Sequence, residues 1–404
     1  MDFSYWCANN MKVVAVIENS ITAGGGFNQA LNAILQMQGI CKGKFEFEVF
    51  TSHDENVNYL KQFDIASVIF SYSIVDKLLA KLNINSWWQT IQSNFRIIGK
   101  FEKKLVSHGC DLVYFVTPSG YAPSLQRLNY IATVWDTCHR DTPEFPEVRE
   151  FNQFFIRERN YHNNLSPALV VLVDSVSLAD SIAFRYGVDR TRLLPMPFSP
   201  SQFLSSALAK SMCDVLTKYN LDEGYFLYPA QFWAHKNHIR ILEALLLLKG
   251  NGLNFQVVFV GDDQGNRASV ERFVEQNDLA NQVRFLGFAP ADDMRGLYEG
   301  CQAVVMPTYF GPTNVPPLEA WMLGKPLIYS THFAEQVKDA AVLVDPDDAS
   351  QLASAMSSCM DVEFCVQLVK AGRSRLQELK NELEISEMEL LARLNRFEKR
   401  LKCW

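Results

Sequence analysis

Several features that would define a class of protein are missing from this 404-residue sequence. Its nine cysteines form no C-x-x-C pair, and no Cys/His spacing suits a zinc site. No run reaches the roughly 18 apolar residues of a membrane span, and no apolar segment follows a basic start. The formal net charge of −7 argues against the basic face that nucleic acid requires. We therefore expect no zinc module, membrane-spanning segment, secretion leader or nucleic-acid partner.

The residues that are present belong to a globular protein with more than one core. Hydrophobic residues make up 48% of the chain and charged residues 21%. At ~150 residues per domain, the length suggests two or three domains, and two large ones fit best. An odd number of scattered cysteines favours a reducing compartment. We expect the protein in the cytoplasm, with the inner face of the cell membrane as an open alternative.

Short β-rich runs alternate with helix-length amphipathic segments, which is typical of parallel-sheet α/β domains. The first set of predicted strands is 12–18, 45–50, 66–70, 111–116, 130–135 and 168–173. The second set is 225–230, 255–261, 283–287, 302–307, 326–330 and 341–345. Two sets of about six predict an α/β protein with two Rossmann-like, doubly wound domains that face each other across a cleft.

The proline-rich stretch LLPMPFSPSQF (193–203) separates the two sets, and we interpret it as a hinge that extends to about Gly224. The predicted domains are 1–200 and 201–375, followed by a helical tail at 376–404. Leu and Ile recur in the tail at spacings of three and four. A helix packed along the outside is our interpretation; basic residues near Leu401 and Trp404 leave peripheral membrane contact as an alternative.

Ligands of open α/β sheets bind beyond the carboxyl ends of the strands, so the loops after strands are the places to search. In the first such loop, Gly24, Gly25 and Gly26 precede a helix predicted to begin near Phe27. Glycines let backbone N–H groups approach an anion at a helix N-terminus. The spacing is not G-x-G-x-x-G, so a phosphate site and a plain tight turn both remain open.

A second loop, VWDTCHRDTPEFPEV, places His139 after a buried-looking strand. A loop histidine at the carboxyl end of a strand is well placed for function. A hydrogen bond that only stabilises the loop is the competing interpretation. We expect Asp136 and Arg140 to be structural partners.

In the third loop, YPAQFWAHKNH, Lys236 falls near the start of a helix with a predicted apolar face of Ile239, Leu242, Leu245 and Leu246. A cation beside a helix N-terminus opposes the helix dipole unless an anion lies between them. This conflict favours Lys236 as a phosphate ligand.

The fourth loop is FGPTNVPPLEAWMLGKP (310–326). Thr313 or Asn314 suits a helix N-cap, and Pro316 and Pro317 suit the first helical positions. We place Glu319 in the first turn. A carboxylate beside bound phosphates would be repelled, so we expect it to face neutral hydroxyl groups such as a ribose diol.

At this point the sequence resembles a known family. YPAQFWAHKNH, VRFLGFAPADDMRGLYEGCQAVVMP and FGPTNVPPLEAWMLGKPLI are similar to the nucleotide-binding half of glycosyltransferase family 4 enzymes, which have the GT-B fold. The Gly-rich start and VWDTCHRDTPEFPEV resemble the acceptor-side half. The variant pattern resembles a bacterial polysaccharide-building subgroup. The resemblance implies transfer of a sugar from a nucleotide-diphosphate sugar to a glycan or lipid-linked glycan, with retention of configuration and without a metal or other cofactor.

The resemblance also assigns roles to residues. It places Lys236 and the backbone at Asn314, Val315, Pro316 and Pro317 on the donor diphosphate, with Thr313 and Gln231 nearby, and Glu319 on the ribose. Gly25 and Gly26 would lie under the phosphates from the other side, and His139 would contact the sugar.

Three positions depart from the family pattern. Gln231 replaces a frequent arginine, Gly311 replaces an acid eight residues before Glu319, and Trp135 precedes Asp136 where a histidine is commoner. The acids of Gly261-Asp262-Asp263 could hold a divalent ion, but we expect them to cap the next helix or lie near the base.

The predicted function is a retaining glycosyltransferase that moves a hexose, with mannose suggested by the subgroup, onto a lipid-linked O-antigen, capsule or exopolysaccharide. Two alternatives remain open: a nucleotide-sugar epimerase of the same architecture, and a nucleotide-sugar-binding protein without catalysis.

Overall fold

The computed structural model describes residues 10–20, 25–82, 90–91, 94–95, 97–201, 204, 210–311 and 314–403. The chain forms two compact units. Unit 1 comprises Met1–Thr137, Phe154–Phe198 and Glu382–Trp404, and unit 2 comprises Cys138–Gln153 and Ser199–Asn381. The change near residue 200 lies where the hinge was expected. Two segments depart from the predicted linear order, because residues 138–153 pack on unit 2 and residues from 382 onward pack on unit 1.

Unit 1 is built on a sheet of parallel strands in the order β3-β2-β1-β4-β5-β6-β7. Its strands are β1 (Lys12–Ile17), β2 (Glu46–Thr51), β3 (Ser67–Ile69), β4 (Leu112–Phe115), β5 (Asn129–Thr133), β6 (Val170–Val173) and β7 (Leu193–Pro195). All six predicted strands are confirmed to within two residues. The prediction missed β7, which it assigned to the hinge. Leu193 and Leu194 are buried and pair with β6, so the proline-rich segment begins only after a last edge strand.

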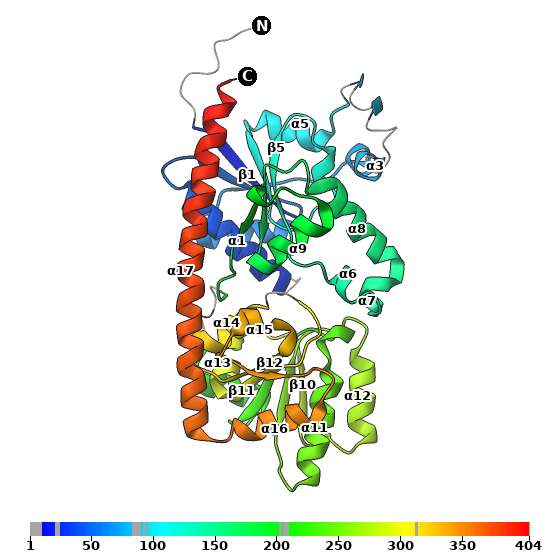
Figure 1. The fold of residues 1–404 in the computed structure, drawn as a ribbon, viewed down its shortest axis with the longest axis vertical. Helices are drawn as coiled ribbons and strands as arrows, with labels where there is room; N and C mark the ends of the chain where they lie inside the picture. The colour runs from blue at the N-terminus through cyan, green and yellow to red at the C-terminus, as the bar shows by residue number, and fades with distance from the viewer. Residues whose placement is uncertain are drawn as a thin grey trace. The chain divides into compact units, whose positions relative to one another are not determined.

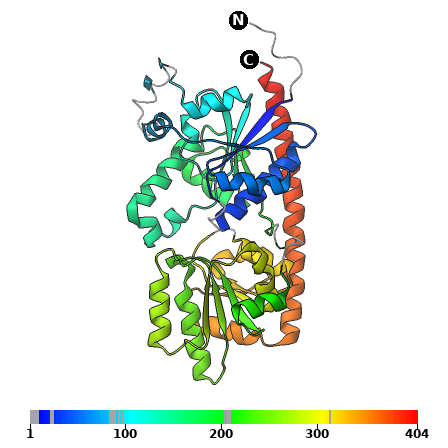
Figure 2. The same ribbon diagram turned by 180° about the vertical axis from the view of Figure 1, so that it is seen from behind.

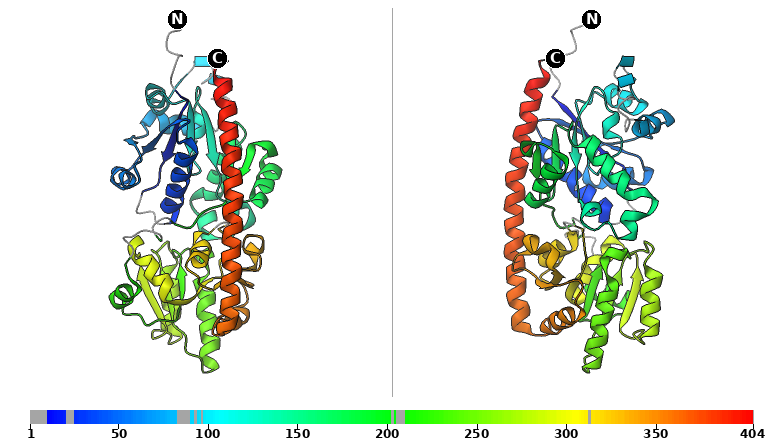
Figure 3. Two further views of the ribbon diagram at one scale, coloured as in Figure 1. Left: turned by 90° about the vertical axis from the view of Figure 1, so that its left-hand side faces the viewer. Right: turned by 45° about the vertical axis from the view of Figure 1, so that its right-hand side comes forward.

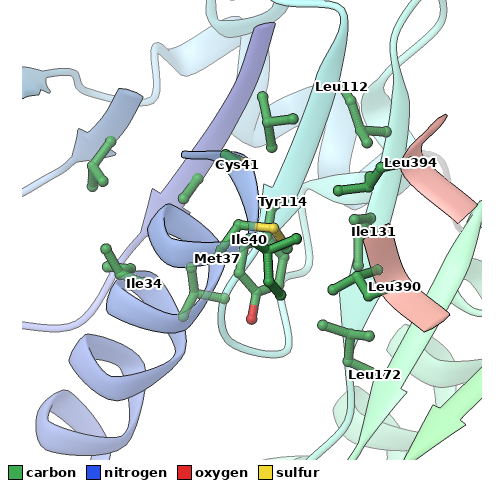
Figure 4. Close-up of a cluster of buried hydrophobic side chains, with 14 of the residues drawn as sticks. Ile34, Met37, Ile40, Cys41, Leu112, Tyr114, Ile131, Leu172, Leu390 and Leu394 are labelled. Carbon is green, nitrogen blue, oxygen red and sulfur yellow. The ribbon is translucent and has the colours of Figure 1, made fainter. Parts of the chain in front are cut away.

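The helices of unit 1 cover both faces of this sheet, as Figures 1 and 2 show. They are α1 (Gly25–Cys41), α2 (Asp54–Leu60), α3 (Ile74–Leu82), α5 (Lys100–Ser107), α8 (Gln153–Asn164) and α9 (Val176–Tyr186). Helix α1 starts two residues before the predicted Phe27, because glycine can occupy a first turn whose N–H groups need no intrahelical partner. On one face, Ile34 and Met37 of α1 pack with Leu112 and Ile131 of the sheet (Figure 4).

Unit 2 contains a second parallel sheet in the order β10-β9-β8-β11-β12-β13. Its strands are β8 (Tyr225–Pro229), β9 (Val257–Val260), β10 (Val283–Gly287), β11 (Cys301–Met306), β12 (Leu327–Ser330) and β13 (Val342–Val344), again within two residues of the prediction. Its helices are α6 (Cys138–Asp141), α7 (Pro146–Arg149), α10 (Met212–Tyr219), α11 (His238–Gly250), α12 (Arg267–Gln276), α13 (Ala291–Gly300), α14 (Val315–Met322), α15 (Ala334–Val337) and α16 (Ala349–Ser358).

Two predictions for unit 2 were wrong. The predicted hinge to Gly224 contains helix α10, which Ser211 caps and which Lys218 ties to the buried Asp293 of α13. Of the predicted apolar face of α11, Leu242 and Leu245 are buried as expected, whereas Ile239 and Leu246 are only half-buried; Ile241, Ala244 and Leu248 complete the buried face. The helix starts at His238, after a residue in left-handed conformation, and this start sets which side chains turn inward.

The last helix, α17 (Val362–Leu401), is one continuous helix (Figure 3). Its residues up to Asn381 belong to unit 2, and those from Glu382 onward belong to unit 1. The predicted tail at 376 therefore lies inside this helix. In unit 2 its Gly372 packs so closely on Trp321 of α14 that an added Cβ would lie 2.4 Å from Trp321 Cδ1. In unit 1 its Leu390 and Leu394 are buried in the core beside α1 (Figure 4).

Two further features bear on the expectations from composition. None of the eight cysteines among the described residues is in a disulfide. No single helix of the described ranges is long and apolar enough to cross a membrane. The bent pair α16 and α17 would pass such a test together by length and composition, but Leu352, Met356 and Leu368 of this pair are buried inside unit 2.

Candidate functional site in unit 2

The candidate site lies where the strand order of the second sheet reverses. Strands β8 and β11 are neighbours, and the chain winds outward from them in opposite directions. The loops that follow these two strands therefore diverge at one edge of the sheet, where open α/β sheets bind ligands. The predicted residues Lys236 and Asn314 lie in these two loops.

Lys236 is held by its backbone. It ends a short 3-10 turn (Ala234–Lys236), and its carbonyl accepts a hydrogen bond of 2.7 Å from the Tyr228 hydroxyl. The next residue, Asn237, has a φ of 57° and donates from Nδ2 to the Pro307 carbonyl at 3.1 Å. This bond ties the loop after β8 to the loop after β11. These bonds fix the backbone position from which the Lys236 side chain extends at the edge of the sheet.

Asn314 connects the lysine to α14. Lys236 Nζ donates to Asn314 Oδ1 at 2.9 Å, while Asn314 Nδ2 donates to the Gly311 carbonyl at 2.7 Å and to the Tyr329 hydroxyl oxygen at 2.6 Å. Asn314 occupies the N-cap position of α14, but its side chain makes no cap hydrogen bond. The side-chain amide of Asn314 instead fixes the position of Lys236 relative to the loop that contains Gly311.

The start of α14 is confirmed as a proline-opened helix. Val315, Pro316 and Pro317 are its first three residues, and the two prolines carry no N–H group. Among these three positions only Val315 offers a backbone N–H to an anion. Lys236 therefore places a full positive charge beside the start of α14, and the helix dipole adds a smaller share.

Gly311 explains how the two loops approach so closely. Its φ is +109°, and an added Cβ would lie 3.0 Å from Asn314 Oδ1 and 3.2 Å from Lys236 Nζ. A side chain at this position would be strained and would press on both polar groups. The glycine that replaces the family's acid is therefore a requirement of this geometry.

A second cluster beside Lys236 was not anticipated. His235 is buried, stacks on Phe310 with ring centroids 3.7 Å apart, and hydrogen-bonds through Nδ1 to the Glu147 carboxylate. Glu147 also accepts from the His235 backbone N–H at 3.0 Å. Burial alone would raise the pKa of Glu147, but its bonds to His235 lower it below the ordinary value. The acidic loop of residues 138–153 is thereby anchored next to Lys236, a pairing across 88 positions that no local pattern reveals.

Glu319 lies in the second turn of α14, not in the first turn as predicted, because the helix starts at Val315. Its side chain is buried and accepts hydrogen bonds from the Ser201 hydroxyl and, at 2.5 Å, from the Tyr298 hydroxyl. Burial raises the pKa of this carboxyl, and the two hydroxyl bonds partly oppose that effect. The carboxylate faces neutral hydroxyl groups, and the chain itself provides two of them.

The remaining predicted residues are more scattered. Gln231 is half-buried and accepts from Trp233 Nε1 at 3.1 Å. His139 is fully buried in α6 of unit 2. Gly25 and Gly26 open α1 in unit 1. Thr313 lies outside the described residues. Within unit 2 the structure thus brings together Lys236 and Asn314 with the unpredicted Gly311 and Tyr329.

The acids after β9 have a structural use. Asp263 accepts hydrogen bonds from the backbone N–H groups of Gly265 at 2.8 Å and Arg267 at 3.1 Å, where α12 begins. These bonds lower the pKa of Asp263. No group of three or more His, Cys, Asp or Glu side chains suited to a metal ion occurs in the part of the chain that the structure describes.

Unit 1 has its own reversal of strand order, between β1 and β4. Glu18 follows β1, and burial raises the pKa of its carboxyl, while the nearby hydroxyl groups of Tyr72 and Ser119 partly oppose that effect. Tyr72 stacks on Tyr121 with ring centroids 3.5 Å apart. Farther along the same edge, Asp174 follows β6 and is buried. This edge therefore presents buried acids and tyrosines.

Comparison with solved structures identifies the fold. HepE of Anabaena in complex with UDP-glucose has a TM-score of 0.70 at 16% identity, covering 95% of this chain and 100% of that one. WaaG, a glycosyltransferase involved in lipopolysaccharide biosynthesis, has a TM-score of 0.64 at 14% identity, covering 93% and 98%. Two parallel-sheet α/β units with these neighbours define a GT-B fold, as the sequence predicted.

Sequence comparison relates unit 2 to a known family. Residues 217–375 match the family Glycosyl transferases group 1. The chain is 27% identical to O-antigen chain mannosyltransferase B of Escherichia coli over 215 residues, which cover 52% of this chain and 56% of that protein. It is 26% identical to O-antigen chain mannosyltransferase RfbU of Salmonella typhimurium over 190 residues, covering 46% and 50%. The chain spans about half the length of these curated relatives.

Proposed function

We propose that this protein is a retaining glycosyltransferase that moves a hexose from a nucleotide-diphosphate sugar to a growing bacterial glycan. The observation that carries the proposal is the contact between Lys236 and Asn314 at the strand-order reversal of unit 2. A lysine at this edge, beside a helix start, is placed to neutralise a diphosphate. The group 1 domain match over residues 217–375 supports the same reading.

In the proposed reaction, the bond between the sugar and the diphosphate breaks, and negative charge grows on the departing phosphate. Lys236 and the Val315 N–H stabilise that charge, as preorganised donors do in transition states. No carboxylate among the described residues of the Lys236 and Asn314 cluster is placed as a nucleophile. We therefore favour front-face substitution. The acceptor oxygen bonds to the sugar's anomeric carbon on the face that the diphosphate leaves, and the departing phosphate accepts the proton of the acceptor hydroxyl.

The other assignments belong to the same proposal. Glu319 binds the ribose by exchanging or extending its hydroxyl partners Ser201 and Tyr298. Gln231, Thr313 and Pro316 lie along the donor, and Gly25 and Gly26 approach the phosphates. His139 contacts the sugar, which requires its buried ring to become accessible when the donor binds. No metal takes part in this scheme.

Mannose and an O-antigen-like acceptor are the finer part of the proposal. They are suggested by two O-antigen chain mannosyltransferases among the relatives. A lipid-linked glycan is the acceptor class in this reading, and the reaction would take place in the cytoplasm or at the inner face of the cell membrane.

The first experiment is a thermal-shift panel with UDP, GDP, dTDP and ADP, each with and without Mg²⁺. A ligand that binds only the native state raises its melting temperature, so one nucleoside diphosphate should shift it without metal. The matching donor sugar is then incubated with and without glycan acceptors. Donor consumption that depends on acceptor supports transfer. Sugar conversion without acceptor would indicate an epimerase, and binding without turnover would indicate a non-catalytic protein.

A further inference from the structure

Residues 138–153 belong to unit 2, although the chain before them forms β5 of unit 1 and most of α8 after them lies in unit 1 again. This segment contains the short helix α7, which begins at Pro146 and has Glu147 in its first turn. Glu144 is exposed to solvent, whereas the side chain of Glu147 is only 11% exposed. Of these two acids, Glu147 is thus the one that reaches into unit 2.

Glu147 makes two hydrogen bonds to a single residue. Its carboxylate accepts from the His235 backbone N–H at 3.0 Å and from His235 Nδ1, which therefore carries a proton. The His235 carbonyl accepts from the Tyr309 N–H at 3.0 Å, and the His235 ring stacks on Phe310. Phe145, two residues before Glu147, packs against Phe310 with ring centroids 5.5 Å apart. The N–H group, the carbonyl and the ring of His235 are thus each held by a different residue.

Lys236 follows His235 directly in the chain. Its backbone N–H donates to the Trp233 carbonyl at 3.1 Å, and its Nζ donates to Asn314 Oδ1 at 2.9 Å. Movement of His235 would therefore displace the backbone from which the Lys236 side chain extends. In an enzyme site, a displacement of about 1 Å can cost about 100-fold in rate. Glu147 is thus placed to control the position of Lys236 through one intervening residue.

The pairing also compensates a charge. A carboxylate close to a phosphate ligand would repel the phosphate groups if it had no partner. The two bonds from His235 provide that partner for Glu147. His235 therefore both fixes the turn before Lys236 and offsets an acid that lies near the proposed diphosphate position.

We propose that Glu147 and His235 are positioning residues of the donor site, which hold the turn that carries Lys236 and do not contact the donor. These roles rest on the proposed function, which makes the donor diphosphate the ligand of Lys236. Simple support of the fold is the competing explanation. It predicts a loss of stability without a specific dependence on Lys236, so nucleotide affinity in combined variants separates the two.

The first measurement is calorimetric titration of each protein with UDP, GDP, dTDP and ADP, which does not depend on turnover. Glu147→Ala should weaken binding of the nucleotide that the parent binds by about tenfold or more, since charge-assisted hydrogen bonds contribute at least this factor. Glu147→Gln should bind within about threefold of the parent, because its amide oxygen can accept the same two bonds. Glu147→Asp keeps the charge but shortens the side chain, and should bind more weakly than Glu147→Gln. The control Glu144→Ala alters an exposed acid of the same segment and should bind like the parent.

A double-mutant cycle with Lys236 is the decisive measurement. If Glu147 acts through Lys236, adding Glu147→Ala to Lys236→Ala should change the nucleotide affinity by less than about twofold. An effect of Glu147 on the fold alone would instead weaken binding by the same factor with and without Lys236. Thermal melts without nucleotide measure the stability of every variant separately.

His235→Ala tests the compensation of charge. It leaves the Glu147 carboxylate without its partner, so nucleotide binding should be weaker than in Glu147→Ala. Adding Glu147→Gln to His235→Ala should then restore binding by about threefold or more, because the unpaired charge is removed. Simple support of the fold predicts no such recovery.

Additive effects of Glu147→Ala and Lys236→Ala would overturn the positioning role. Parent-like binding by Glu147→Ala, or an equal loss in Glu144→Ala, would overturn it as well. Failure of the proposed function would look different. In that case the parent would bind none of the four nucleotides, or Lys236→Ala would bind like the parent, and the positioning role would fall with it.

Discussion

The two units have similar sheets, yet the edges at which their strand orders reverse carry opposite chemistry. In unit 2, the loops after β8 and β11 bring together Lys236 and Asn314. In unit 1, the loop after β1 carries Glu18, whose carboxyl has its pKa raised by burial beside Tyr72 and Ser119. The fold sets where a site forms, whereas the side chains at its edge decide what it can bind.

This difference indicates that the two edges favour different ligands. An edge with a lysine favours a diphosphate, while an edge with acids and tyrosines suits neutral, hydroxyl-rich ligands. The variants below weaken, exchange or isolate these properties, starting with the largest expected effect.

We expect the largest effect from Lys236→Ala, because it removes the positive charge that distinguishes the unit 2 edge from the unit 1 edge. Loss of the main cation at the unit 2 edge is expected to reduce transfer at least about 100-fold, a typical cost of removing a group that stabilises transition-state charge. The nucleotide-dependent thermal shift should shrink as well. Lys249→Ala removes an exposed lysine from the same stretch of chain and serves as the control. Equal activity in both variants would remove Lys236 from the site.

Replacing Gly311 with Glu gives the unit 2 edge an acid like that of unit 1. The positive φ would cost about 1–3 kcal/mol of strain, and the new side chain would crowd Lys236 and Asn314. We expect nucleotide diphosphate binding, measured by calorimetry, to weaken at least about tenfold, since 1.4 kcal/mol corresponds to that factor. Gly250→Glu, at an open position of α11, adds the same charge and should bind normally. Tight binding by the Gly311 variant would contradict the close approach of the two loops.

Gly372→Ala tests how α14 is positioned, without changing any charge at the site. The added methyl group would overlap Trp321, which lies in the helix whose N-cap is Asn314. We expect a loss of about 1–3 kcal/mol in the free energy of unfolding, the usual cost of overpacking. The matched change Gly39→Ala, in α1 where nothing lies within 4 Å, should be neutral or slightly stabilising. Urea denaturation of both proteins distinguishes them, and equal stability would argue against the tight α14–α17 contact.

Replacing Asp174 with Asn tests the acidic edge of unit 1. Burial raises the pKa of Asp174 to about 7, and the negative charge of Asp136 contributes in the same direction. As pH rises from the ordinary value of 3.8 toward 7, the unfolded chain releases this proton before the folded chain does, so the parent loses stability. The variant should therefore be more stable than the parent at about pH 8, by on the order of 2 kcal/mol, and no more stable at about pH 4.

The control for this change is Asp180→Asn, which alters an exposed acid of α9. Thermal melts across the pH range compare the three proteins. A stability difference for Asp174→Asn that does not depend on pH would show that the pKa of Asp174 is the same in the folded and the unfolded chain, and would contradict the raised pKa.

Local sequence patterns were sufficient for most of the fold. Apolar runs such as Val257–Val260 are short, rich in β-branched residues and bounded by polar loops. The residues in and around each run are therefore sufficient to predict a β-strand. Edge strand β7 was missed because Leu193-Leu194 is too short a signal beside three prolines. The start of α11 was misread because Asn237 adopts a left-handed conformation that only its bonds to Pro307 and Pro346 explain.

For the candidate site, the sequence predicted Lys236 as a phosphate ligand and the resemblance added the backbone at Asn314, and the structure places these two residues in contact. It could not find Tyr329 or the Glu147–His235 pair, because these contacts join positions far apart in the chain. The resemblance shows Gly311 in place of an acid, and the structure adds that this glycine is required by close packing.

The sequence by itself determined two α/β sheets, a helix opened by Pro316 and Pro317 and a lysine in a loop after a strand, because these depend on periodicity and on the backbone preferences of single residues. The tertiary structure decided which loops meet, that Glu319 is buried against Ser201 and Tyr298, and that α17 contributes to both cores. Those outcomes depend on long-range packing and on hydrogen bonds between distant residues, which no local pattern encodes.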